Sequence, residues 1–423
     1  MNSFATLKCI NCGKPGPIDN MFDGCPSCKA NGYPSNYTTT FNYSTLKKKI
    51  SNNWPLNGKG LWKYKQLMPV SEKTKPVSMA EGDTPLLHLE RFGECLDLEK
   101  LYIKDETRNP TWSYKDRLCS VAVTRGIEVG AKVITIASTG NHGASAAAYA
   151  AKASIPCVIF TTPQVPQTMK TLMQVYGAYV VATPTPADRW KIMKQCVKKL
   201  NWYPVSGYVE PPIGSNPFGV DGYKTISYEI IEQLGNVPDF VAVPAAYSDG
   251  LYGIWKGMKE LKLLGVTARL PKMIASEVFG SLTNTLALQR SIPLPAEAVE
   301  STVSFSIASR LGTYQGLIAL KESAGLANTS SDLETMNMQK LLASTEGIYA
   351  EASSVTSLVV IAKLRKKGLI NAQDTVVAVL TSSGLKDPLS TARLLENVPV
   401  VEPELDVLFN KLNAMGYTGS LKI

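Results

Sequence analysis

The chain contains 423 residues, of which 44% are hydrophobic and 19% are charged, a composition typical of globular proteins and unlike that of disordered chains. This length exceeds the usual size of a single hydrophobic core, so we expect two domains or one elaborated domain. Lysine and arginine total 44 against 35 acidic residues, for a formal net charge of +9. The basic residues are scattered, without a block of interleaved aromatic residues, so nucleic-acid binding is disfavoured.

No apolar run approaches the roughly 18–20 residues that span a bilayer. The segment Met1–Ile10 has neither a long apolar core nor a small-residue cleavage site. We therefore expect no membrane association, no secretory signal and a cytoplasmic location. A mildly basic chain also suits anionic small substrates, although charge alone does not establish one.

The N-terminal region carries four of the eight cysteines in a regular pattern. Cys9, Cys12, Cys25 and Cys28 form Cys-x2-Cys-x12-Cys-x2-Cys, the spacing of a tetrahedral zinc site in which two tight turns each present a pair of thiolates. Two disulfides in a secreted module are the alternative, which the missing signal and the four further cysteines disfavour. Four thiolates leave no open coordination position, so residues 1–35 are predicted to form a structural zinc-ribbon-like module, independent of catalysis.

The next segment, residues 36–80, is polar and rich in Asn and Lys, and we interpret it as a loosely structured connector. From Leu86 onward, short apolar runs alternate with segments of helical period, a pattern typical of an α/β protein with parallel sheets. We assign residues 81–130 and 241–423 to a large domain and residues 131–240 to a smaller αβ domain. The predicted strands are Leu101–Ile103, Val133–Ala137, Cys157–Phe160, Tyr179–Ala182, Phe240–Val243, Met273–Ala275 and Val376–Leu380. The predicted helices are Asp116–Gly126, Gly143–Ala153, Gln167–Tyr176, Ala187–Leu200, Leu251–Leu264 and Ser354–Lys367.

Three strand-end loops are rich in small polar residues, namely Ala137–Gly143, Val243–Gly250 and Leu380–Pro388. Parallel sheets bind ligands beyond the carboxyl ends of their strands. The first two loops open helices whose free N–H groups could hold a carboxylate or a phosphate. A plain capped turn explains any one of them about equally well, but three such loops in one sheet favour a cleft.

Lys115 lies in the segment Asn109–Arg117, at the start of a predicted helix between small polar and aromatic residues. A partly buried amine there would have a lowered pKa and could form a Schiff base, although most lysines are simply solvated. Other catalytic patterns are missing: the chain has no Walker-type phosphate loop, no Gly-x-Gly-x-x-Gly and no Gly-x-Ser-x-Gly. With two histidines in all, histidine-based metal catalysis is disfavoured.

Taken together, these segments resemble the tryptophan-synthase-β-like, or fold-type II, pyridoxal-phosphate enzymes, and within them the threonine synthase branch. The matching motifs, in the same order as in that family, are Glu81–Leu86, Asn109–Arg117, Ser138–His142, Asn216–Thr225 and Thr381–Pro388. The resemblance covers about Leu7 to Pro388, and a cysteine ribbon occurs in some members. It implies a homodimeric lyase that uses pyridoxal 5'-phosphate and acts on an amino acid.

The resemblance also implies roles for individual residues. Lys115 would bind the cofactor as a Schiff base and shuttle the substrate's α-proton. Asn141 would hydrogen-bond the cofactor's phenolic oxygen, and Thr381 would meet its pyridine nitrogen. The loop for the cofactor phosphate would consist of Ala245, Ala246, Tyr247, Ser248, Asp249 and Gly250. The substrate carboxylate would lie on Ser138, Thr139, Gly140 and Asn141, with Thr84.

Several positions depart from the pattern of the threonine synthase branch, among them Ala245 and Ala246, which stand where the cofactor-phosphate loop usually begins with glycine. Gly219 stands where an arginine usually helps to hold the substrate phosphate, His142 where Thr or Ser is usual, and Trp112 where Gly is usual. We expect these three to set side-chain specificity in a more aromatic and less anion-binding pocket. Asp249 would repel the cofactor phosphate unless it caps the following helix.

Three functions are consistent with these observations. The first is a threonine synthase-like lyase that converts O-phosphohomoserine to threonine and phosphate. The second is a dehydratase or synthase acting by β-elimination or β-replacement on a serine- or threonine-type amino acid, which His142 favours. The third is a non-catalytic binding protein with the same fold, which Lys115, Asn141 and Thr381 disfavour.

Overall fold

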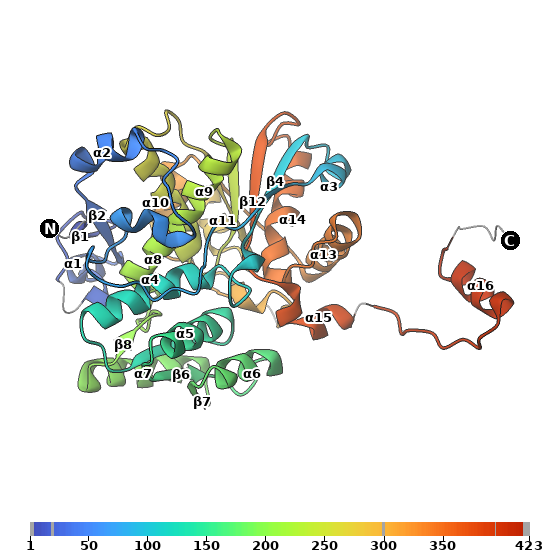
Figure 1. Ribbon diagram of the computed structural model, residues 1–423, viewed down its shortest axis with the longest axis horizontal. Helices are drawn as coiled ribbons and strands as arrows, with labels where there is room; N and C mark the ends of the chain where they lie inside the picture. The colour runs from blue at the N-terminus through green and yellow to red at the C-terminus, as the bar shows by residue number, and fades with distance from the viewer. Residues whose placement is uncertain (1–3, 18–20, 298–300, 394, 418–423) are drawn as a thin grey trace. The chain divides into compact units, whose positions relative to one another are not determined.

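The computed structural model describes residues 4–17, 21–297, 301–393 and 395–417 (Figure 1). Parts of the predicted N-terminal module, residues 1–3 and 18–20, lie outside these ranges. The chain divides into two units, Met1–Asp387 and Pro388–Ile423. None of the helices in the described ranges has the length and apolarity to cross a membrane.

The N-terminal module consists of a two-stranded antiparallel sheet and one short helix. Strand β1 (Phe4–Cys9) pairs with β2 (Tyr37–Phe41), and α1 (Pro26–Ala30) lies between them in the chain. Because β2 belongs to this sheet, the module extends beyond the predicted residue 35.

The predicted loose connector is instead packed into the body of the protein. It forms β2, α2 (Tyr43–Ser51) and the 3-10 segment η2 (Leu61–Leu67). Several of its apolar side chains are buried, among them Ile50, Leu61 and Leu67, and the ring of Tyr64 lies 4.9 Å from that of Tyr228. The polar composition of this segment predicted a loose connector, but the burial of these apolar residues anchors it to the body of the protein.

The larger sheet has six strands in the order β11-β10-β9-β12-β4-β3. All neighbouring strands are parallel except β3, which runs antiparallel to β4 at one edge. The strands are β3 (Leu86–His88), β4 (Lys100–Asp105), β9 (Phe240–Pro244), β10 (Lys272–Glu277), β11 (Leu326–Thr329) and β12 (Thr375–Leu380).

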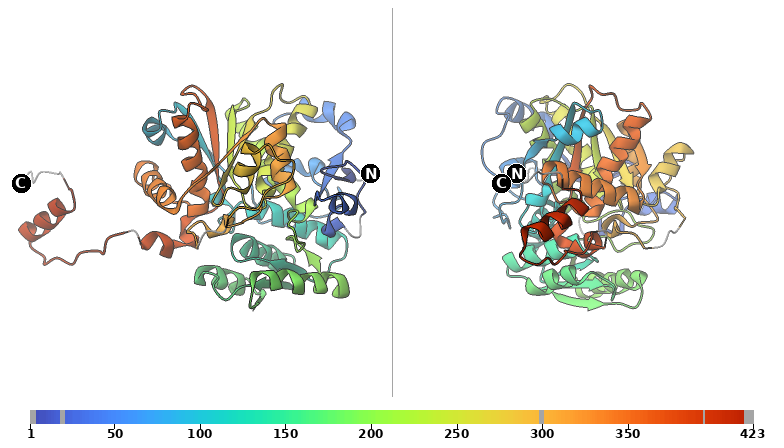
Figure 2. Two further views of the ribbon diagram at one scale, coloured as in Figure 1. Left: turned by 180° about the vertical axis from the view of Figure 1, so that it is seen from behind. Right: turned by 90° about the vertical axis from the view of Figure 1, so that its right-hand side faces the viewer.

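The smaller sheet is wholly parallel, in the order β7-β6-β5-β8, and forms a separate layer with its helices (Figures 1 and 2). Its strands are β5 (Ile134–Ala137), β6 (Cys157–Thr161), β7 (Tyr179–Ala182) and β8 (Tyr203–Pro204). Its helices are α5 (Asn141–Lys152), α6 (Gln167–Val175) and α7 (Pro186–Leu200). Alanine at six of the twelve positions of α5 favours helix and permits close packing.

All seven predicted strands and all six predicted helices are present, and the predicted α/β class with parallel sheets is confirmed. Strands β1, β2, β3, β8 and β11 were not predicted; β3 and β8 are only three and two residues long. The other helices of the first unit, which include the predicted α4, α10 and α14, are α3 (Glu90–Cys95), α4 (Lys115–Glu128), α8 (Pro217–Val220), α9 (Lys224–Leu234), α10 (Asp249–Leu263), α11 (Ser281–Ala287), α12 (Tyr314–Glu322), α13 (Asp332–Glu346) and α14 (Ala352–Lys366). The 3-10 segments are η1 (Met21–Asp23), η3 (Glu106–Arg108), η4 (Asp221–Tyr223), η5 (Phe305–Ile307) and η6 (Gly384–Lys386).

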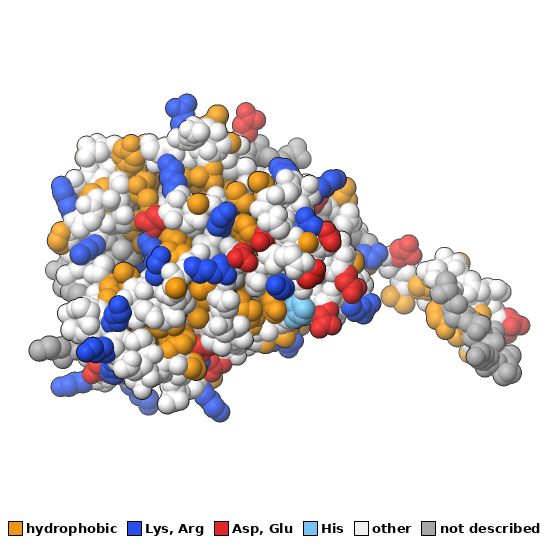
Figure 3. Space-filling model, turned by 90° about the horizontal axis from the view of Figure 1, so that it is seen from above, with side chains coloured by type: hydrophobic (Ala, Val, Ile, Leu, Met, Phe, Trp, Pro, Cys, Tyr) orange, Lys and Arg blue, Asp and Glu red, His pale blue; other side chains and the backbone are white. Residues whose placement is uncertain are grey.

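The C-terminal unit contains α15 (Pro388–Ala392) and α16 (Leu405–Ala414), neither of which has a buried residue. The large domain predicted for residues 241–423 therefore does not include this last segment as part of its core. On the face seen in Figure 3, lysine and arginine side chains are spread among acidic and apolar ones and do not form one basic patch.

Candidate active site

The carboxyl ends of β5, β9 and β12 meet at one cavity of about 220 Å³. The three polar strand-end loops predicted from the sequence all contribute to its wall. The predicted site residues that line it are Lys115, Ser138, Thr139, Gly140, Asn141, His142, Ala246, Tyr247, Ser248, Asp249, Gly250 and Thr381.

Lys115 is the first residue of α4 and extends its amine into the cavity. Its Nζ lies 5.0 Å from the ring centroid of Tyr114 and 5.7 Å from that of Tyr223. The next residue, Asp116, faces the interior, where its carboxylate accepts hydrogen bonds from Thr111 and Ser145. Across the described chain, Lys115 forms no ion pair, so its amine is available to a ligand.

The loop between β9 and α10 presents a row of backbone N–H groups to the cavity. Among the described residues, no acceptor pairs with the N–H groups of residues 246–250. Ser248 adopts a left-handed conformation with φ +62°, and the Tyr247 carbonyl is held by Thr313 Oγ1 at 2.7 Å and Gln315 Nε2 at 2.8 Å. Free N–H groups at the start of a 15-residue helix fit a phosphate group. Ala245 does not line the cavity, because its N–H binds the Ser276 carbonyl within the sheet.

The carboxylate of Asp249 does not cap α10 and is occupied by three donors. It accepts hydrogen bonds from Ser215 N at 2.8 Å, Ser215 Oγ at 2.7 Å and Gln315 Nε2 at 2.7 Å. These donors offset its charge, so the repulsion expected between Asp249 and a phosphate is reduced.

The loop after β5 offers a second set of backbone donors. Ser138 Oγ accepts hydrogen bonds from Gly140 N at 3.2 Å and Gly143 N at 3.0 Å, and so caps the start of α5. The N–H groups of Thr139, Asn141 and His142 have no acceptor among the residues described. A substrate carboxylate would therefore meet backbone donors here, while the Ser138 hydroxyl holds the loop in shape.

Asn141 is oriented by a residue that the sequence analysis missed. Its Nδ2 donates to Glu351 Oε2 at 2.7 Å, and its Oδ1 accepts from Ser382 Oγ at 3.1 Å. Glu351 is buried and also accepts from Ser306. It directly precedes α14, where an acidic residue is ordinary, so no local signal distinguished it. Thr381 pairs through its hydroxyl with Ser354 Oγ at 2.9 Å.

His142 is buried at the cavity wall. Its Nε2 has no hydrogen-bond partner within the described ranges. Burial, together with the nearby charge of Lys115, lowers the pKa of His142 well below its usual 6.5, so the imidazole is neutral at pH 7.

Three predicted substrate residues do not line the cavity. Thr84 is buried, where its hydroxyl donates to Glu106 and accepts from Arg117 in an ion-pair network. Trp112 is 45% exposed and has φ +58°. Gly219 lies in α8 against α4, where a Cβ would come within 3.0 Å of Leu118 and Ala122. The structure therefore places these three residues outside the cavity wall, because their positions depend on packing that the motifs do not reveal.

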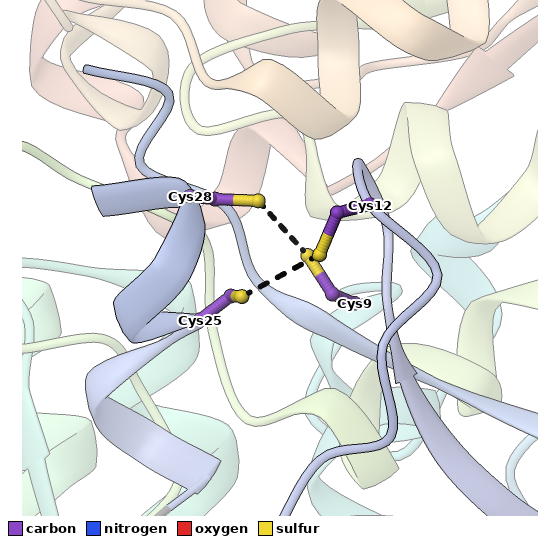
Figure 4. Close-up of side chains that lie close together, drawn as sticks. All are labelled: Cys9, Cys12, Cys25 and Cys28. Atoms are coloured by element: carbon purple, nitrogen blue, oxygen red, sulfur yellow. Dashed lines mark hydrogen bonds between the residues drawn. The ribbon is translucent and has the colours of Figure 1, made fainter. Parts of the chain in front are cut away.

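The four N-terminal cysteines form a compact cluster with their side chains pointing toward one another (Figure 4). Their Sγ atoms all lie within 4.8 Å of one another, and all four thiols are free. Burial raises the pKa of Cys9 and of Cys28, so a bound cation is needed to keep these two sulfurs ionised at neutral pH. Four convergent thiols on two turns fit a tetrahedral zinc ion.

This module also touches the wall of the cavity. Asn36 Nδ2 donates to the Ser215 carbonyl at 2.9 Å, and Tyr314 donates to Asn11 Oδ1 at 2.8 Å. The sequence analysis expected this module to be independent of catalysis; the structure shows that it contacts Ser215, a residue of the cavity wall.

Comparison with known proteins agrees with this geometry. Residues 77–382 match the family "Pyridoxal-phosphate dependent enzyme". The chain is 33% identical to threonine synthase from Methanocaldococcus jannaschii over 95% of this chain and 98% of that protein, and 33% identical to threonine synthase from Methanosarcina acetivorans over 95% and 97%. The structure of diaminopropionate ammonia lyase from Escherichia coli superimposes with a TM-score of 0.64 at 16% identity, over 75% of this chain and 88% of that one, which confirms the expected fold. The chain thus belongs to the pyridoxal-phosphate-dependent enzyme family, in which it is a threonine synthase-like carbon–oxygen lyase.

Proposed function

We propose that the protein converts O-phosphohomoserine and water to threonine and phosphate. The observation that carries this proposal is the convergence in one cavity of an unpaired lysine amine and two rows of free backbone N–H groups. One row suits the phosphate of pyridoxal 5'-phosphate and the other an amino-acid carboxylate. When bound, the cofactor stabilises negative charge on the substrate carbons during elimination and addition.

The residues of the chain would then act as follows. Lys115 holds the cofactor covalently and moves the proton at the substrate's α-carbon. Asn141, oriented by Glu351, hydrogen-bonds the cofactor's phenolic oxygen, and Thr381 meets its pyridine nitrogen. A neutral hydroxyl at that nitrogen does not enforce its protonation, which suits elimination more than transamination. The N–H groups of Ala246–Gly250 hold the cofactor phosphate, and the loop Ser138–His142 binds the substrate carboxylate.

We also propose that Cys9, Cys12, Cys25 and Cys28 bind one structural zinc ion. The compact cluster of free thiols supports this assignment. Elemental analysis of protein purified without chelators should give one zinc per chain, and a disulfide between any two of these cysteines would argue against it.

A second candidate function is β-elimination from a serine- or threonine-type amino acid. The neutral imidazole of His142 at the cavity wall, whose Nε2 has no partner within the described ranges, favours it, because such a ring nitrogen can hydrogen-bond a hydroxyl group of the substrate.

Product analysis separates the two candidates. Threonine and phosphate released in equal amounts from O-phosphohomoserine would support the first, while pyruvate or 2-oxobutanoate formed from serine or threonine at a higher specificity constant would support the second. Lys115→Ala is the control: it should lose both the visible absorption band of the bound cofactor and turnover. Full turnover by this variant would refute the role given to Lys115.

A further inference from the structure

Arg189 is a second cation at the cavity, and no sequence motif singled it out. Two of the described cavity-lining side chains are positively charged, Lys115 and Arg189. Arg189 lies in the first turns of α7, on the smaller αβ layer, opposite the loops of the larger sheet. The acid among the lining residues, Asp249, is occupied by Ser215 and Gln315 and does not neutralise it.

The guanidinium of Arg189 has no anionic partner in the described part of the chain. Its Nε donates to the Pro186 carbonyl at 3.1 Å, which leaves the N–H groups of its two terminal nitrogens unpaired. The adjacent acid, Asp188, pairs instead with Lys191 at 3.1 Å and with the Thr185 hydroxyl at 2.6 Å. Burial lowers the pKa of Arg189 below its usual 12.5, with no carboxylate to offset the loss of water. A partly desolvated, unpaired guanidinium is suited to binding an anion.

Two hydroxyl-bearing loop residues, Tyr247 and Ser309, line the same cavity as Arg189. The ring of Trp190 contacts that of Tyr247 at 5.9 Å, which brings this part of α7 against the loop after β9. Burial raises the pKa of Tyr247, and a hydrogen bond with Ser309 and the charge of Arg189 offset part of this rise. The more distant acids that act on Tyr247 are Asp249, already paired, and the exposed Glu210.

We propose that Arg189, with Tyr247 and Ser309, binds the tetrahedral oxyanion carried by the side chain of the amino-acid substrate. This rests on the proposed function, in which that oxyanion is a phosphate ester. A planar guanidinium matches two oxygens of a phosphate at once. Arg189 thereby supplies the cation that Gly219 lacks, and Gly219 itself faces α4. The same chemistry could serve the phosphate of the cofactor, so the test must separate the two phosphates.

The test begins with the binding of inorganic phosphate to the cofactor-loaded enzyme, measured by calorimetry. Arg189→Gln should weaken phosphate binding about 10- to 100-fold, the range for losing a charge-assisted contact. Arg189→Lys keeps the positive charge but lacks the planar guanidinium that can donate to two phosphate oxygens at once, so its affinity for phosphate should lie between those of wild type and Arg189→Gln. Lys194→Gln removes one charge from an exposed position on the same helix and should bind phosphate as wild type does. Equal phosphate affinity in wild type and Arg189→Gln would overturn the proposal.

A second measurement separates the cofactor from the substrate. Arg189→Gln should retain pyridoxal phosphate with wild-type affinity, and it should raise KM for O-phosphohomoserine about 10- to 100-fold more than KM for an unphosphorylated amino acid. Weakened cofactor binding with unchanged phosphate affinity would assign Arg189 to the cofactor and refute the proposal. If wild type binds phosphate through Arg189 yet does not turn over O-phosphohomoserine, the proposed function fails while the oxyanion site stands.

Discussion

Ser215 donates two hydrogen bonds to the carboxylate of Asp249, from its backbone N at 2.8 Å and from its Oγ at 2.7 Å. Asp249 opens the helix that follows the free N–H groups, and Ser215 in turn accepts a hydrogen bond from Asn36 of the cysteine module. A continuous chain of three residues therefore connects the proposed zinc module to the loop proposed for the cofactor phosphate. Through this connection, changes in the N-terminal module are expected to alter the affinity of the cavity for the cofactor, which can be measured.

Replacing Asn36 should weaken cofactor retention even though this residue does not line the cavity. Asn36→Ala removes the bond to Ser215, and the loss of one buried hydrogen bond of about 0.5–1.5 kcal/mol corresponds to a rise of about 2- to 10-fold in the dissociation constant of pyridoxal phosphate. Lys14→Ala is the matched control, because the Lys14 amine contacts the exposed Ser27 within the module. Zinc removal should act in the same direction as Asn36→Ala. Unchanged cofactor affinity in both cases would show that the module and the cavity are uncoupled.

Trp112 carries backbone strain that a glycine would relieve. Its φ of +58° is costly for a residue with a Cβ, and its carbonyl accepts hydrogen bonds from Ser382 Oγ and Ser383 N that hold this conformation. Trp112→Gly and Trp112→Ala both remove the indole, but only glycine removes the strain. We expect the glycine variant to exceed the alanine variant in unfolding free energy by about 1 kcal/mol, measured from urea midpoints. An alanine variant at least as stable as the glycine variant would contradict this account.

An arginine at position 219 should not restore an anion site. A Cβ at Gly219 would lie 3.0 Å from the side chains of Leu118 and Ala122, so the longer side chain enters a packed interface between α8 and α4. We expect Gly219→Arg to lower the unfolding free energy by about 1–3 kcal/mol and to leave the specificity constant for O-phosphohomoserine unimproved. Gly219→Ala isolates the effect of the Cβ alone. A higher specificity constant in Gly219→Arg would mean that the side chain reaches the substrate.

The placement of these residues shows what the sequence could and could not predict. The loops after β5, β9 and β12 were predicted to converge on the assumption that the three strands belong to one sheet. Only β9 and β12 share a sheet; β5 belongs to the smaller one, so its loop meets the other two through the packing of the two sheets, which the sequence pattern does not reveal. Whether position 219 faces the cavity or the neighbouring helix α4 depends on how the four-residue helix α8 is rotated about its axis, and a sequence motif does not specify this rotation. Arg189 and Glu351 reach the site only because α7 and α14 pack across from it, and such long-range packing leaves no local pattern. The segment 36–80 was predicted to be loosely structured because its average composition is polar. Its buried apolar side chains hold it against the rest of the protein, and an average over the segment does not reveal them.

His142 gives a prediction in which the sign of the pH effect follows from burial. Because the pKa of its imidazole is held well below 6.5, the folded protein leaves His142 neutral while the unfolded chain takes up a proton as the pH falls through 6.5. The contribution of His142 to the free energy of unfolding is therefore complete above pH 6.5. Below pH 6.5 the free energy of unfolding falls by at most about 1.4 kcal/mol for each pH unit. His142→Gln should remove this dependence from the urea midpoint between about pH 5.5 and 6.5.

The imidazole can also be observed directly, since His142 and His88 are the two histidines of the chain. In a His88→Gln background, selective labelling leaves one histidine resonance, which should stay at the position of a neutral ring from pH 8 to about 5.5. Burial is the larger cause of the lowered pKa and the charge of Lys115 the smaller, so Lys115→Gln should move the titration toward, but not to, the ordinary value. A ring that titrates near 6.5 in the folded protein would show that water reaches His142, and it would remove the argument for a neutral imidazole at the substrate.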